Sequence, residues 1–410
     1  MPGLRPLFCS GRSIGEGGNK LSDLNCWLWL SLCKGVSAAS AQKYLRRFGS
    51  AKGVYYAAES ELREVEGATG AEIKALMNRD LNRAERVRAA CEKQGVRILC
   101  LQDADYPDRL RNIPDPPTVL YIRGTLPPVD DRLTIGIVGT RKASAYGREM
   151  AESIGRELAE AGAVVVTGLA EGIDSAAAKG ALQGPGAVIA VLGTSTDKVY
   201  PAWNGKLQGA VEKSGALVSE YPPGTGPTRA SFPQRNRIIS GLSLGITVVQ
   251  APQKSGSLIT AARAQEQGRD VFAVPGMAND AGFAGSHALI RDGAQLVCSG
   301  EDILEEYRFR FPQLLAFRDG RQARNSRREA PQPALDKAGD VGYHALKEQL
   351  EELTETELEL VGLLAGGEKH SDDLIAAAGR DPGEVITSLV MLQLKGYVAE
   401  EDHRYRLLVS

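Results

Sequence analysis

Apolar residues recur at helical spacing through the first quarter of the chain. Leu24, Leu28 and Leu32 belong to one such series, and glycines interrupt the pattern at intervals. A period near 3.6 residues with glycine breaks predicts several short helices. We therefore expect a small helical domain, of the helix-hairpin-helix or SAM-like kind, over residues 21–100, after a disordered leader over residues 1–20. Its glycine turns lack the paired glycines of a phosphate-gripping hairpin, which favours a structural role for this domain.

The middle of the chain, residues 101–312, alternates short β-rich apolar runs with helical stretches. This alternation predicts βαβ units and a doubly wound, mostly parallel sheet, with ligands bound at the carboxyl ends of the strands. The predicted strands cover residues 134–138, 163–167, 187–192, 216–219, 246–250, 270–274 and 295–298. The predicted helices cover residues 144–161, 173–182, 203–214, 235–242, 258–267 and 287–292.

The pattern changes again toward the C-terminus. Residues 313–350 include a stretch rich in charge, proline, glycine and alanine, which predicts a flexible linker. Residues 351–410 contain three helical stretches followed by two short strand-like runs, an order typical of a winged-helix domain. Acidic side chains outnumber basic ones in this last domain. Because such a surface repels phosphate, we expect it to bind protein rather than DNA.

Composition limits the kinds of function. The chain has 410 residues, 43% of them hydrophobic, which is enough for two or three folded domains. Its formal net charge is only −2, because 49 lysines and arginines face 51 aspartates and glutamates. A protein of this charge does not coat nucleic acid by bulk electrostatics, so binding of a polyanion requires a local cluster of cations.

Signals for metals, cofactors, catalysis and membranes are absent from the sequence. The six cysteines include no CxxC pair and the four histidines are scattered, so we expect neither zinc nor disulfides, and reduced thiols in the cytoplasm. HExxH, GxGxxG and P-loop motifs are missing, so we expect no catalytic residue and no cofactor. No apolar run reaches the length of a membrane span, and no signal-peptide pattern opens the chain.

One local cluster of cations stands out. Arg235, Asn236 and Arg237 lie in a segment that ends in a helix, and Lys254 lies in a second such segment after the next strand. Backbone amides at the start of a helix add donors for an anion. We expect the two arginines to straddle a strand of phosphates at the loop-to-helix junction. For either arginine alone, an ion pair with a carboxylate is an equally open alternative.

Two glycine-rich loops follow the first two predicted strands of the parallel sheet. Residues 136–139 let the backbone approach an anion, and Arg141 and Lys142 directly after them favour phosphate. In the second loop, we expect Asp174 to cap the helix that follows. Glu171 in the same loop is unfavourable to a polyanion unless a cation neutralises it.

These segments together resemble the DNA processing protein A family (DprA, also called Smf). The resemblance is specific, because order and spacing agree through the whole βαβ region and over about half of the chain. The motifs that carry it lie at residues 106–107, 115–117, 137–141, 168–174, 191–193, 200–201, 219–222, 232–239, 254–257 and 274–276.

The resemblance implies a Rossmann-like domain that binds single-stranded DNA in a positive groove and forms homodimers. It also implies a non-enzymatic protein that protects incoming DNA and loads the recombinase RecA onto it during transformation or recombination. From their places at strand ends near the cations, Phe232 or Tyr221 is a candidate for stacking on a base, with ordinary packing of the ring as the alternative. The DNA contacts predicted with Phe232 are Thr140, Arg141, Lys142, Gly168, Arg235, Asn236, Arg237, Lys254, Ser255, Gly256 and Ser257.

Two positions depart from the family pattern. Glu171 stands where the family usually has a basic residue, and Ala178 stands where it usually has a histidine. We expect the first to lower DNA affinity or shift the register of the strand. An alternative hypothesis is a nucleotide-processing enzyme similar to the phosphoribohydrolases, but Pro275–Ala278 lacks the threonine and glutamate of their PGGxGTxxE loop. A third is a scaffold whose acidic C-terminal domain recruits a partner.

Overall fold

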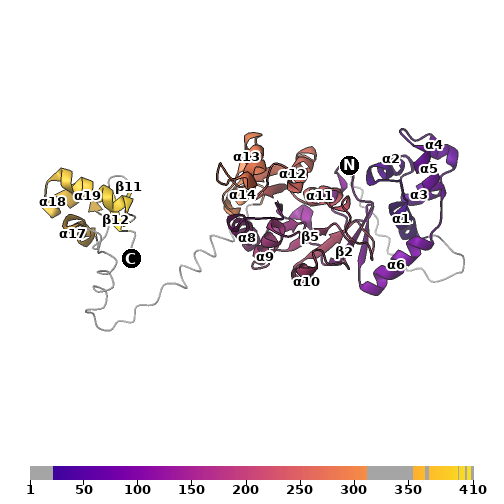
Figure 1. Ribbon diagram of the computed structural model, residues 1–410, viewed down its shortest axis with the longest axis horizontal. Coiled ribbons are helices and arrows are strands. Elements are labelled where there is room, and N and C mark those ends of the chain that lie inside the picture. The colour runs from indigo at the N-terminus through magenta and orange to yellow at the C-terminus, as the bar shows by residue number, and fades with distance from the viewer. Residues whose placement is uncertain (1–21, 312–353, 365–368, 396, 402–403, 408–410) are drawn as a thin grey trace, which may run out of the picture. The chain divides into compact units, whose positions relative to one another are not determined.

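A computed structural model of the chain describes residues 22–311, 354–364, 369–395, 397–401 and 404–407 (Figure 1). The chain divides into two compact units, Met1–Glu329 and Ala330–Ser410. The predicted leader over residues 1–20 and the predicted linker over residues 313–350 lie outside the described residues. None of the described helices is long and apolar enough to cross a membrane.

The first unit begins with a group of short helices, in agreement with the helical spacing of its apolar residues. Ser22, Ser37 and Ser50 each accept a hydrogen bond from a backbone N–H in the first turn of the helix that they precede. Gly49 and Gly95 end two of the helices in the left-handed conformation. Whether the domain is of the helix-hairpin-helix or SAM-like kind stays a prediction. The helices are α1 Asp23–Leu32, α2 Ala38–Phe48, α3 Ala51–Tyr56, α4 Glu59–Arg63, α5 Gly70–Met77 and α6 Asn82–Gln94.

A buried carboxylate holds these helices together. Glu72 of α5 accepts hydrogen bonds from Lys43 Nζ at 2.7 Å, Tyr44 Oη at 3.2 Å and the backbone N–H of Thr69 at 2.9 Å. Burial alone would raise the pKa of this carboxyl, but the hydrogen bonds from Lys43, Ser40 and Thr69 outweigh it and lower the pKa from 4.5 to about 2.

Changing Glu72→Gln is expected to lower the free energy of unfolding at pH 7 by about 2 kcal/mol, because hydrogen bonds to a charged group are lost. The folded pKa lies below the unfolded one, so the stabilisation is complete above pH 4.5 and disappears as the pH falls toward about 2. The gap between wild type and variant should close over that window. Urea unfolding, followed by the fluorescence of Trp27 and Trp29 in α1 in a Trp203→Phe background, measures the difference in free energy of unfolding. If that difference persists to pH 2, the charge of Glu72 is not what stabilises the helices.

The rest of the first unit is built on a nine-stranded sheet in the order β1-β2-β6-β5-β4-β3-β7-β8-β9. Strands β3 to β9 are parallel to one another, while β2 runs antiparallel to both β1 and β6. The doubly wound, mostly parallel sheet predicted from the sequence is therefore confirmed. The strands are β1 Arg97–Cys100, β2 Val119–Gly124, β3 Thr134–Val138, β4 Val164–Thr167, β5 Val188–Leu192, β6 Ala216–Ser219, β7 Gly245–Val248, β8 Asp270–Ala273 and β9 Gln295–Leu296.

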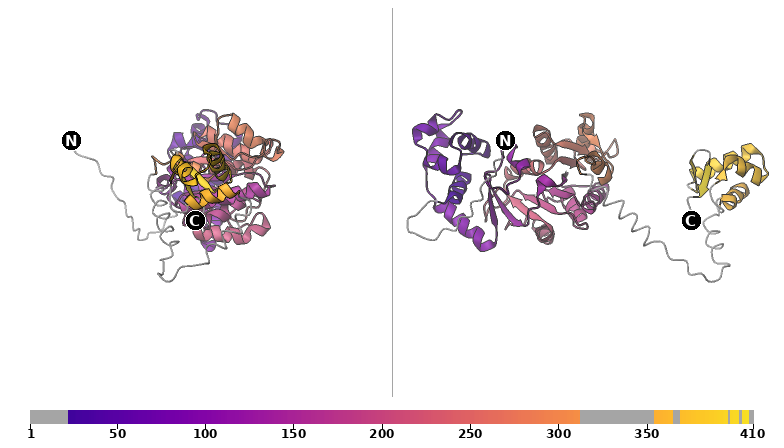
Figure 2. Two further views of the ribbon diagram at one scale, coloured as in Figure 1. Left: turned by 90° about the vertical axis from the view of Figure 1, so that its left-hand side faces the viewer. Right: turned by 180° about the vertical axis from the view of Figure 1, so that it is seen from behind.

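The strands β1 and β2 were not predicted from the sequence. The antiparallel pair β1 and β2 extends the sheet at one edge, and β1 falls inside the range assigned to the helical domain. Helices α1 and α6 pack beside this edge, as Figures 1 and 2 show from opposite sides. The N-terminal helices and one face of the sheet consequently share a single apolar core.

Helices cover both faces of the sheet. Alternate residues of β4 show the two layers: Val165 packs in a core with α8 and α9, whereas Val164 and Val166 pack in the core of α11 and α12. Helices α10 and α14 also lie on the α8 face. The helices are α7 Asp108–Arg111, α8 Ala145–Glu160, α9 Ile173–Ala181, α10 Gly205–Ser214, α11 Ser231–Leu242, α12 Gly256–Glu266, α13 Ala284–Arg291 and α14 Gly300–Glu306, and the 3-10 turns are η1 Val129–Asp131, η2 Ala202–Asn204 and η3 Ala281–Phe283.

The described part of the second unit contains three helices and a small antiparallel sheet of order β10-β12-β11. Leu360, Leu374 and Leu389 from the three helices meet in its core. The strand β10 was not expected from the sequence, and both the winged-helix class and the protein-binding role stay predictions. The elements are α17 Glu355–Leu364, β10 Lys369–His370, α18 Ser371–Ala378, α19 Pro382–Leu394, β11 Val398–Glu401 and β12 Arg404–Leu407.

Candidate nucleic-acid interface

A cleft of ≈ 660 Å³ opens at the carboxyl ends of the parallel strands. Its walls are the loops that follow β3 and β7, the segment 227–229 before α11, and the first turns of α11 and α12. Ligands of doubly wound sheets bind at this edge. Ten of the predicted contacts line it: Thr140, Arg141, Lys142, Phe232, Arg235, Asn236, Lys254, Ser255, Gly256 and Ser257.

Exposed cations surround the cleft. Arg141, Lys142, Arg229 and Lys254 are all exposed, and none of them makes an ion pair with a residue that the structure describes. Cations without carboxylate partners remain available to an anion in solution. The loops after β3 and β7 and the start of α11 therefore form a positive rim in a chain whose total charge is near zero.

Aromatic rings stand beside one of these cations. The guanidinium of Arg141 lies 5.0 Å from the ring centre of Phe232, and this ring lies 5.2 Å from that of Tyr200. A guanidinium over an aromatic face is attracted by the ring, which helps to hold Arg141 in place. Phe232 and Tyr200 both line the cleft, so flat apolar surface and positive charge meet at the same point.

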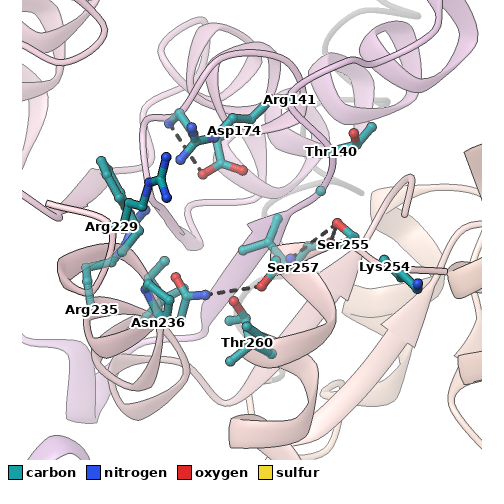
Figure 3. A pocket seen from close by; sticks show the side chains of 18 of the residues that line it. Thr140, Arg141, Asp174, Arg229, Arg235, Asn236, Lys254, Ser255, Ser257 and Thr260 are labelled. Carbon is teal, nitrogen blue, oxygen red and sulfur yellow. Dashed lines mark hydrogen bonds between the residues drawn. The ribbon is translucent and has the colours of Figure 1, made fainter. Parts of the chain in front are cut away.

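The start of α12 supplies polar groups to the opposite wall. Ser255 caps the helix by accepting from the N–H of Ser257, and the two hydroxyls lie 2.7 Å apart. Asn236 of α11 donates its side-chain amide to the carbonyl of Gly256 at 3.2 Å, which ties the two helices together (Figure 3). A Cβ on Gly256 would meet no atom within 4 Å, so packing does not require glycine there. Its exposed backbone at the helix N-terminus is open to an anion.

Arg235 lies below the cleft rather than in its open part. It is only 5% exposed and donates Nη1 to the carbonyl of Val191 at 2.5 Å. Burial lowers its pKa to about 10, partly offset by the charge of Asp174, so Arg235 is charged at neutral pH. Gly168, another predicted contact, does not line the cleft: a Cβ at this position would collide with the guanidinium of Arg235. Glycine is therefore needed there to make room for Arg235.

Arg237 is also absent from the cleft, which corrects the idea of two arginines straddling phosphates. Helix α11 begins at Ser231 rather than at Arg235, so both arginines lie inside a regular helix and diverge. The buried Arg237 instead forms ion pairs with the half-buried carboxylates of Asp115 at 3.1 Å and Glu220 at 2.7 Å. Burial would lower its pKa, but the two carboxylates outweigh burial and raise it. The ion-pair alternative holds for this residue.

The prediction that Asp174 caps its own helix is wrong. The cap position is Gly172, whose φ of 84° suits glycine and whose missing Cβ leaves space for the carbonyls of Thr140 and Arg141. The buried carboxylate of Asp174 accepts instead from the loop amides of Gly168 at 3.1 Å and Ala170 at 3.4 Å. Asp174 thus fixes the loop after β4 against the floor of the cleft.

The two departures from the family pattern lie away from the cleft. Glu171 is exposed and lines a neighbouring groove, which it shares with Arg141. Ala178 is fully buried in the core between α8, α9 and the sheet. Neither side chain therefore lies among those that line the cleft itself.

Sequence reasoning missed Arg229. This residue lines the cleft from the segment before α11, two residues before the first helical position. The signal that could have found it is a basic residue close to Phe232 and Pro233. The helix was expected to begin at residue 235, so Arg229 was not placed next to its first turn. Among the described residues, no group of three or more His, Cys, Asp or Glu side chains could hold a metal ion.

Comparisons with known proteins converge on one family. Residues 97–308 match the family described as DNA recombination-mediator protein A. The chain is 43% identical over 221 residues to DNA processing protein DprA of Bacillus subtilis, covering 54% of this chain and 74% of that protein. It is 33% identical over 385 residues to Protein Smf of Synechocystis, covering 92% and 96%. The X-ray structure of DprA from Streptococcus pneumoniae superposes with a TM-score of 0.60 at 36% identity, covering 69% of this chain and 97% of that one.

Proposed function

We propose that this chain, which belongs to the DNA recombination-mediator protein A family, binds single-stranded DNA in the cleft around Arg141. The observation that carries the proposal is the meeting of unpaired cations with aromatic rings at one point. Arg141 and Lys254 are free to contact phosphates, and Phe232 and Tyr200 offer surfaces for bases. These are the two elements of a site that binds single strands without sequence preference.

The aromatic rings favour a single strand over a duplex. Bases in a duplex are already paired and stacked on each other, so they cannot stack on Phe232 without being unpaired first. A single strand presents its bases freely while its phosphates reach Arg141, Lys142, Arg229 and Lys254. The polar groups at the start of α12 would contact the same strand through backbone amides and hydroxyls.

The family supports a wider role. As a recombination mediator, the chain would protect incoming single-stranded DNA, act in the cytoplasm as a homodimer formed through the sheet domain, and load RecA onto the bound strand. The segment Pro275–Ala278, which would matter for a nucleotide-processing enzyme, is not among the residues that line the cleft.

Binding of fluorescent oligo(dT) of twenty nucleotides, compared with a duplex of the same length, tests the proposal. The single strand should bind more tightly, and its association constant should fall with salt, because each neutralised phosphate contributes a slope of about −0.7 in a plot of log K against log salt. Oligo(dT) and a mixed sequence should bind within a few-fold of each other. Equal affinity for the duplex, or no binding of the single strand, would contradict the proposal.

A further inference from the structure

A second groove, of ≈ 700 Å³, borders the cleft on the far side of Arg141. It lies over α8 and α9 and is closed at one end by the 3-10 turn η2. Arg141 lines both hollows, so the two are neighbours rather than separate sites.

Trp203 of η2 is the most prominent apolar side chain of the groove. It is 69% exposed, although tryptophan is usually largely buried. The residue after it is fixed: Asn204 is only 8% exposed and donates to the carbonyl of Leu169 at 3.0 Å and to Ser175 Oγ at 2.9 Å. The backbone that carries the exposed indole is therefore anchored to α9 and to the loop after β4.

Aromatic side chains line both the cleft and the groove. Phe232 and Tyr200 form a ring pair in the cleft, and Trp203 follows Tyr200 by three residues around η2. Aromatic side chains on which successive bases stack are a common way to hold a single strand. Phe232 and Tyr200 in the cleft and Trp203 in the groove therefore place aromatic side chains in both hollows that Arg141 lines.

The charges of the groove are nearly balanced. Its basic side chains are Arg141, Arg148, Arg156 and Lys179, and its acidic side chains are Glu149, Glu152 and Glu171. Glu152 accepts a hydrogen bond from the side chain of Gln183, and no described carboxylate forms an ion pair with one of the four cations. The three carboxylates offset most of the positive charge, so attraction of phosphate is weaker here than in the cleft, and stacking would supply much of the affinity for a strand.

We propose that this groove is a second subsite, in which a base of the strand leaving the cleft stacks on Trp203. The inference rests on the proposed binding of single-stranded DNA and extends its footprint. A short strand fills the cleft alone, whereas a longer one reaches the indole. Because stacking is not screened by ions, the contribution of Trp203 persists at salt concentrations that weaken the contacts of Arg141.

Intrinsic fluorescence gives a direct test. The chain has three tryptophans, and Trp27 and Trp29 are each only 3% exposed in α1, so quenching by bound bases reports on Trp203. A 20-nucleotide oligo(dT) should quench the emission, and a Trp203→Phe variant should lose the quenching while keeping most of the affinity. Trp203→Ala should bind the 20-mer roughly tenfold more weakly, the loss expected for one stacked base.

Strand length and a matched variant separate the possible failures. Trp203→Ala should bind oligo(dT) of six nucleotides like wild type, and Tyr56→Ala, which removes another exposed aromatic side chain from α3, should leave both affinities unchanged. If wild type binds the 20-mer without quenching and Trp203→Ala binds it equally well, the second subsite is wrong while the cleft stands. If wild type binds neither oligonucleotide, the proposed function itself is wrong.

Discussion

Replacing Arg141 by alanine is expected to weaken the binding of a 20-nucleotide oligo(dT) by about 10- to 100-fold, since one charge-assisted hydrogen bond contributes about 1.5–3 kcal/mol. Arg141 is exposed, has no ion-pair partner among the described residues, and lines both the cleft and the groove beside it. Its loss also removes the cation over Phe232. The slope of log K against log salt should become shallower by about 0.7, the value for one phosphate contact on a single strand.

Fluorescence anisotropy at several salt concentrations measures both quantities. Arg141→Lys keeps the charge but loses the planar guanidinium, so its affinity should fall between wild type and alanine. Arg88→Ala is the matched control, because Arg88 is an exposed arginine of α6 whose ion-pair partner is Glu92. All three variants should unfold like wild type. If Arg141→Ala keeps the wild-type affinity and salt slope, Arg141 does not contact the strand.

Replacing Arg237 by methionine is expected to lower the free energy of unfolding by about 3 kcal/mol, because removal of one member of a buried ion pair leaves the other charge uncompensated. Two carboxylates, those of Asp115 and Glu220, would lose the cation that they share. The arginine side chain is only 5% exposed, so water can replace it poorly. The variant should nonetheless bind oligo(dT) with the affinity of wild type when measured on folded protein.

Urea unfolding at pH 7 and anisotropy on the same preparation test the two halves of this prediction. Adding Asp115→Asn and Glu220→Gln to Arg237→Met should recover part of the lost stability, since the uncompensated charges are then gone. Arg237→Met therefore contrasts with Arg141→Ala, which should fold normally but bind poorly. If the Arg237→Met protein is as stable as wild type and binds oligo(dT) more weakly, Arg237 contacts the strand and the structural assignment fails.

The sequence predicts most of the sheet because its parallel strands are buried on both faces. Runs such as residues 164–166 and Val188–Leu192 are continuously apolar and stand between helical stretches, which is the pattern of βαβ units. Strands β1 and β2 do not belong to such βαβ units. They are antiparallel to their neighbours at the sheet edge, and no helix of the usual crossover length separates them.

The cleft is predicted less completely than the sheet. Arg141 lies in the glycine-rich loop after β3, and Lys254 lies in the loop that leads into α12. Local sequence is therefore enough to place both at the carboxyl ends of strands. The roles of Arg235 and Arg237 depend on where α11 begins and on carboxylates far away in the chain. Nothing near residue 237 indicates that Asp115 lies 3.1 Å from its guanidinium. Only the packed structure shows which arginine faces solvent.

A crystal structure of the full chain with bound oligo(dT) tests the central claim most directly. We expect phosphate oxygens within hydrogen-bonding distance of the Arg141 guanidinium and of the first turn of α12, with a base against Phe232 or Tyr200. We also expect Arg237 in its ion pairs with Asp115 and Glu220, away from the strand. A strand bound on another surface, with Arg141 and Lys254 contacting only solvent, would contradict it.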